Sequence, residues 1–72
     1  MAEPMKVIVT LDDKHVPEIE QIAAQCEAAG MKVMSQLEML GQITGDVDPK
    51  LQAALREIPG VLSVEESKDV QL

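Results

Sequence analysis

A predicted helix ends and a predicted strand begins within the stretch Ala29-Gly30-Met31-Lys32-Val33. The same helix-to-strand step occurs again later in the chain, at Pro59-Gly60-Val61-Leu62-Ser63. Gly30 supplies the left-handed residue with which helices commonly end, and apolar residues at alternating positions follow it. A helix-to-strand step that occurs twice indicates two similar halves. Each half is therefore predicted to run strand, helix, strand.

The first half begins with residues 5–11, Met-Lys-Val-Ile-Val-Thr-Leu, which alternate and are rich in β-branched side chains, so they predict a strand. The two acids that follow, Asp12 and Asp13, are well placed near a helix N-terminus, where the dipole favours negative charge. Apolar residues then recur at helical spacing and predict a helix over 16–29. Pro17 is tolerated because it falls in the first turn.

The second strand is expected over 31–39, where alternation places Leu37 and Met39 on the same buried face as Met31 and Val33. A weaker third strand is predicted over 42–47.

Asp48-Pro49 is typical of a helix start, with the aspartate as cap and the proline at the first helical position. The last strand is expected over 61–65, with Leu62 and Val64 facing the core.

The predicted order of strand, helix, strand, strand, helix, strand indicates an α+β fold. Each strand-helix-strand unit crosses over right-handedly, which puts both helices on one face of a four-stranded antiparallel sheet. This is the ferredoxin-like arrangement, predicted as a single domain over 1–72. The uncovered face is either solvated or a docking surface. Alternation assigns the following residues to it: Lys6, Ile8, Thr10, Lys32, Met34, Gln36, Glu38, Gln42, Thr44, Val61 and Ser63.

The composition narrows the classes of partner. Among 72 residues there are thirteen acids against six bases, for a net charge of −7, and no aromatic residue. This balance disfavours nucleic acids and anionic membrane surfaces, whose affinity comes from phosphate neutralisation. No stretch approaches the ~20 apolar residues of a membrane span, and no basic-then-apolar signal opens the chain. A cytoplasmic protein is expected, and a fragment of a secreted precursor stays an alternative.

The sequence does not predict a set of side chains that could act together in catalysis. His15 and Cys26 are single members of their types, with the histidine in a solvated loop and the thiol on a buried helix stripe. One cysteine allows no multi-cysteine metal site. Arg56 is predicted on the outer, solvated side of the second helix, and Gly45 where a strand packs closely under a helix. The expectation is a protein that is not an enzyme and has no cofactor or metal.

Three segments together resemble a known family: residues 5–11 followed by Asp12-Asp13, the stretch 29–33, and Ile58-Pro59-Gly60-Val61-Leu62-Ser63-Val64-Glu65-Glu66. In their order and spacing they are similar to the subtilisin-propeptide (I9) inhibitor family, over nearly the whole chain. Freestanding members of similar length inhibit serine proteases without being attached to one.

The resemblance implies a mechanism and a set of binding residues. The open sheet face would pack on two parallel surface helices of a subtilisin-like protease, and Glu65 and Ser67 would cap the N-termini of those helices. The C-terminal tail would lie in the active-site cleft as an added strand. The protein-binding residues implied on this basis are Ile8, Met34, Gln36, Thr44, Glu65, Ser67, Lys68, Asp69, Val70, Gln71 and Leu72.

The alternative is a small ferredoxin-like interaction or regulatory module that forms a homodimer through the same open face. A small-molecule-binding domain of this topology is a third candidate.

Overall fold

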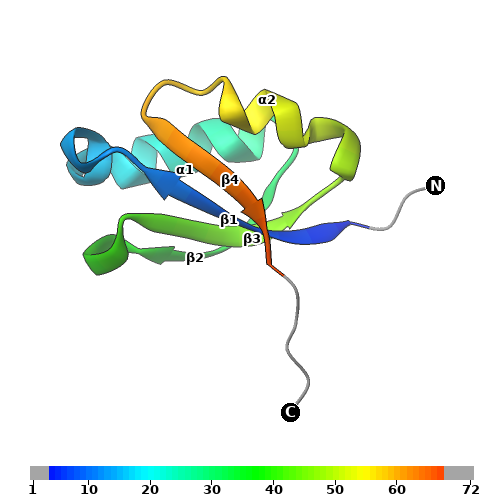
Figure 1. The fold of residues 1–72 in the computed structure, drawn as a ribbon, viewed down its shortest axis with the longest axis horizontal. Coiled ribbons are helices and arrows are strands. Elements are labelled where there is room, and N and C mark those ends of the chain that lie inside the picture. The colour runs from blue at the N-terminus through cyan, green and yellow to red at the C-terminus, as the bar shows by residue number, and fades with distance from the viewer. Residues whose placement is uncertain (1–3, 68–72) are drawn as a thin grey trace, which may run out of the picture.

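Four strands form one antiparallel sheet in the order β2-β3-β1-β4 (Figure 1). They are β1 (Met5–Leu11), β2 (Lys32–Leu37), β3 (Gln42–Val47) and β4 (Val61–Glu66). The computed structural model describes residues 4–67. This strand order is that of the predicted ferredoxin-like layout, so the predicted fold class is confirmed.

Two helices cover one face of the sheet, α1 (Ile19–Ala28) and α2 (Gln52–Arg56) (Figure 1). Their inward side chains join those of the strands in a single core. The core contains Val7, Val9, Leu11, Ile19, Ile22, Ala23, Cys26, Met31, Ile43, Val47, Leu55 and Val64. All of these are aliphatic or sulfur-containing, as a chain without aromatic residues requires.

Both helices begin as 3-10 turns, η1 (Asp13–Glu18) before α1 and η3 (Pro49–Leu51) before α2. The predicted helix over 16–29 is therefore α-helical only from Ile19 onward. Pro17 explains the delay, because it has no N–H to donate and disfavours helical geometry at the residue before it. The predicted cap at the second helix is confirmed, since the Asp48 carboxylate accepts a hydrogen bond of 2.9 Å from the Lys50 N–H.

The second strand departs from its predicted alternation because it contains a β-bulge. Val33 pairs with Gly45, but the next paired residue is Ser35, which lies opposite Thr44, so Met34 is the extra residue. Beyond the bulge every side chain changes face relative to a regular strand. The prediction that Leu37 and Met39 are buried is therefore wrong. Leu37 lies opposite Gln42 and is 38% exposed, whereas Met39 lies in the turn η2 (Glu38–Leu40) and is fully exposed.

A second bulge changes the last strand in the same way. Ser63 pairs with Thr10 and Val61 with Leu11, which leaves Leu62 as the extra residue, 68% exposed. Val61 packs against the core instead. The predicted inward position of Leu62 and the predicted open position of Val61 are both wrong, whereas the inward position of Val64 is confirmed.

Gly45 is buried for a different reason from the predicted one. A Cβ atom at this position would collide with the carbonyl oxygen of Lys32 and would lie 3.0 Å from Cε of Met31. The close approach is thus to the backbone of β2, beside its bulge, and not to a helix.

Among the described residues no helix is long and apolar enough to cross a membrane.

Candidate functional site

The face of the sheet opposite the helices is the candidate site, and we call it the open face. Residues directly opposite in an antiparallel pair share a face, so the strand register defines its members. They lie in rows across the four strands, with no described helix over them: Lys6, Ile8, Thr10, Lys32, Met34, Ser35, Leu37, Gln42, Thr44, Asp46, Ser63 and Glu65.

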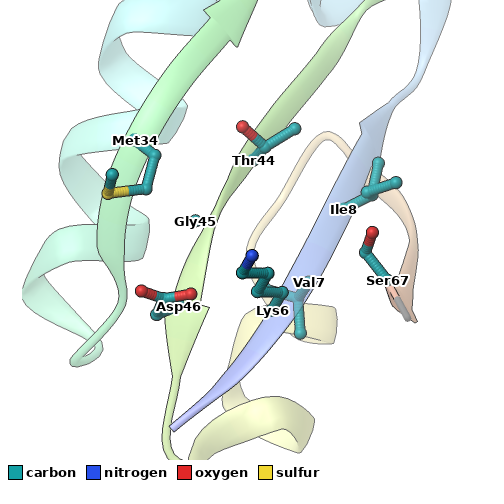
Figure 2. Close-up of a pocket in the computed structure, with 8 residues that line it drawn as sticks. All are labelled: Lys6, Val7, Ile8, Met34, Thr44, Gly45, Asp46 and Ser67. Carbon is teal, nitrogen blue, oxygen red and sulfur yellow. The ribbon is translucent and has the colours of Figure 1, made fainter. Parts of the chain in front are cut away.

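A shallow hollow of about 300 Å³ lies on the open face, and Ser67 lies at its rim. Figure 2 shows Met34 of β2 and Ile8 of β1 on opposite sides of Thr44, which belongs to β3 between them. Met34 is 62% exposed and is the most accessible apolar side chain lining the hollow. Met34, which lies outside the regular pairing, and Ile8 give the hollow an apolar rim within a mostly polar sheet surface.

The charges of the open face balance one another. Asp46 lies opposite both Lys6 and Lys32, so these three side chains form one row across β1, β3 and β2. Glu65, opposite Ile8, supplies a second acid. In a chain of net charge −7, a surface with two bases and two acids can approach a partner without strong repulsion of like charges.

The structure brings four of the predicted binding residues together, since Ile8, Met34, Thr44 and Ser67 all line the hollow. Glu65 lies on the same face, opposite Ile8.

Gln36, in contrast, lies opposite the buried Ile43, on the helix side of the sheet, so its predicted position on the open face is wrong. Glu38, in the turn η2, is likewise outside the sheet face. The β-bulge at Met34 causes the change at Gln36. The remaining predicted residues lie outside the described part of the chain: Lys68, Asp69, Val70, Gln71 and Leu72.

Three members of the open face were missed by the sequence reasoning, namely Asp46, Ser35 and Leu37. Asp46 follows Thr44 at the next alternate position of a regular strand, so the alternation alone could have identified it. Leu37 could not have been identified, because its face depends on the bulge, and nothing in the sequence of β2 marks the extra residue.

The single cysteine of the chain lies inside the core. Cys26 is completely buried in the core, and this burial, assisted by the nearby Glu27 carboxylate, raises the pKa of its thiol to about 11. A thiol that stays protonated at neutral pH is a poor nucleophile. Within residues 4–67, no three side chains of the types that bind metals lie together.

His15 differs from its predicted solvated position, whereas Arg56 is exposed, as predicted. The imidazole of His15 is half-buried against the turn at Gly60, where a Cβ atom would lie only 2.9 Å from its Cγ. Its buried Nδ1 has no hydrogen-bond partner among the described residues. The Arg56 guanidinium is exposed but donates a hydrogen bond of 3.3 Å to the carbonyl of Val64, which ties α2 to β4.

Comparison with known proteins gave no match, whether to a protein-family model, to a curated protein or to a solved structure. The resemblance to the subtilisin-propeptide family stays a prediction, and it depends on the sequence motifs alone.

Proposed function

We propose that this chain is a non-enzymatic binding protein that docks its open face on a subtilisin-like serine protease, as propeptide-type inhibitors do. The observation that carries the proposal is the hollow on the open face, where Met34 and Ile8 provide apolar contact. An exposed apolar patch of this kind is a surface that a protein partner can bury, and the balanced charge around it avoids strong repulsion of like charges.

Two residues at the end of β4, Glu65 and Ser67, support the proposal. The pairing between β1 and β4 continues beyond Glu66, since the N–H of Ser67 donates a hydrogen bond of 2.8 Å to the carbonyl of Lys6. Ser67 is thereby fixed at the rim of the hollow. Glu65 and Ser67 are thus held beside the proposed docking surface, where their oxygens can cap the N-termini of two partner helices.

An inhibition assay with matched variants tests this proposal. The intact chain should inhibit a subtilisin with one-to-one stoichiometry. Met34→Asp should weaken inhibition strongly, because it places a charge within the buried contact. Met39→Asp makes the same chemical change in the turn η2, away from the open face, and should leave inhibition unchanged.

The role of the tail is tested separately with a chain that ends at Ser67. If the residues beyond it occupy the protease cleft, this truncation abolishes inhibition. Absence of inhibition by the intact chain across several subtilisins would refute the proposed function. Equal loss in Met34→Asp and Met39→Asp would show that the open face is not the docking surface.

A second candidate is self-association through the same face, and the charge balance of that face favours it. A net charge of −7 makes copies of the chain repel one another, and this repulsion is weaker where acids and bases alternate, as in the row formed by Lys32, Asp46 and Lys6. Light scattering distinguishes the candidates, because this one requires a stable dimer that Met34→Asp converts to a monomer.

A further inference from the structure

A second depression, of about 540 Å³, lies between the start of the helical layer and the turn that joins β2 to β3. We call it the Met39 groove. Its lining comes from η1, from the first turn of α1 and from η2, and none of it belongs to the open face. The residues that form it are Val16, Pro17, Ile19, Glu20, Glu38 and Met39.

The groove is held in shape by contacts with the core. The N–H of Leu11 donates a hydrogen bond of 2.7 Å to the carbonyl of Gly41, the residue that ends η2. Gly41 has a φ of 64°, and a Cβ atom there would lie 2.9 Å from Cγ2 of Val16. Only glycine allows this close approach in a left-handed conformation. The turn that carries Met39 is therefore fixed against η1.

The groove combines an apolar floor with an exposed apolar rim. Ile19 is buried in the core and Val16 packs against it, whereas Pro17 is exposed. The side chain of Met39 is 100% exposed, more than that of any other large apolar residue described. Methionine is flexible and polarizable, and proteins use it at surfaces that adapt to apolar side chains of a partner.

The charge around the groove is strongly acidic, in contrast to the open face. Glu20 and Glu38 line the groove on its two sides. The segment 12–20, which supplies four of the six lining residues, contains four acids and a single lysine. An acidic rim attracts cationic groups and repels acidic ones, which selects the charge of the partner.

We propose that the Met39 groove binds a protein segment in which an apolar side chain is flanked by lysine or arginine residues. The apolar side chain contacts Met39, Pro17 and the half-buried Val16, and the flanking cations pair with Glu20 and Glu38. This site is independent of the proposed docking of the open face, so each can fail without the other.

A tryptophan-containing peptide is a suitable probe, because the chain has no aromatic residue and contributes no background emission. The probe is a short peptide with a Trp-Leu pair flanked by lysines. Its control carries glutamates in place of the lysines. Binding of the lysine peptide should shift the tryptophan emission to shorter wavelength and raise its anisotropy, whereas the glutamate peptide should not bind.

Variants of equal net charge localise the binding. The double substitution Glu20→Gln/Glu38→Gln should weaken binding of the lysine peptide by about fivefold, as expected for two exposed ion pairs. The control Glu27→Gln/Glu57→Gln removes the same charge from exposed positions outside the groove and should leave binding unchanged. Met39→Ser should abolish the emission shift, and the same substitution at Met34, Met34→Ser, should leave it intact. Circular dichroism checks that each variant is folded.

Three results would overturn the proposal. Equal weakening by the two double substitutions would mean that the peptide binds only to the overall negative charge. An emission shift that persists in Met39→Ser would mean that the tryptophan is buried elsewhere. Failure of the lysine peptide to bind would also refute the groove as a site, while the protease assay would remain unaffected.

Discussion

At Gly45, β3 passes too close to the backbone of β2 to leave room for a Cβ atom. Substitution to alanine would force a Cβ atom into the carbonyl oxygen of Lys32, and a backbone atom within a paired strand cannot move away cheaply. Gly45→Ala should therefore lower the free energy of unfolding by about 2 to 3 kcal/mol, the upper range of overpacking effects. Urea denaturation followed by far-ultraviolet circular dichroism measures this.

Ser35→Ala is the matched control for this measurement. It adds no atom and lies at an exposed position of the adjacent strand, so the free energy of unfolding should change by less than about 0.5 kcal/mol. Equal stability of Gly45→Ala and the unchanged chain would show that β2 and β3 are farther apart than described.

Because of Cys26, the free energy of unfolding should depend on pH in the alkaline range. Its thiol pKa is about 11 in the folded chain against 9.0 for an ordinary thiol, because burial disfavours the thiolate. The folded state therefore retains this proton between pH 9 and 11 while the unfolded state loses it. Stability from the protonated thiol is complete below pH 9 and falls as the pH rises to 11.

Denaturation at a series of pH values, compared with Cys26→Ala, isolates this contribution. All other ionisable groups are common to both chains, so the signal is the difference between their free energies of unfolding. That difference should shrink from pH 9 to 11. A constant difference would mean that the thiol ionises equally easily in both states.

At the scale of single elements, the sequence predicted β1 and β3 with their bounds and the start of the second helix, but it did not predict the faces of β2 and β4. Strand existence follows from β-branched residues and alternation, which are local signals. A β-bulge depends on how two strands pair, which is not a local signal. The extra residues are Met34 and Leu62, and neither methionine nor leucine is a residue type that indicates a bulge. The predicted binding set consequently included Gln36 and missed Leu37.

The bulge in β2 makes an unusual deletion experiment possible. Removing either Met34 or Ser35 would leave one residue where there are now two, and the flanking pairs, Val33 with Gly45 and Gln36 with Ile43, would keep their register. Both single-residue deletions should therefore fold. Only the deletion of Met34 removes the apolar rim of the hollow, so only this one should lose partner binding through the open face.

Denaturation and amide hydrogen exchange of β2 would measure the outcome of these deletions. Without a bulge, either deletion would turn every following side chain of β2 to the opposite face and would destabilise the sheet severely. Unfolding of both deletion variants would therefore contradict the described register.

For the whole molecule, the topology could be predicted because the order of elements and the right-handed crossover leave few alternatives. The distribution of charge over the surface could not. The sequence gives a net charge of −7, but only the strand register shows that Asp46 lies between Lys6 and Lys32 while other acids gather near η1. The two candidate surfaces consequently differ in charge although they belong to one small domain.

Two substitutions that remove the same charge should therefore change stability in opposite directions. Glu27→Gln removes an acid from the last turn of α1, where the helix dipole disfavours it, and should raise the free energy of unfolding by about 0.5 kcal/mol. Asp46→Asn removes an acid that lies opposite two lysines and should lower it by a similar amount, about 0.5 kcal/mol. Thermal denaturation at low and high salt measures both effects, and high salt should reduce each of them because screening weakens exposed charge interactions. If both substitutions stabilised the chain equally, net charge and not the placement of charge would govern its stability, and the balanced charge of the open face would lose its significance for docking.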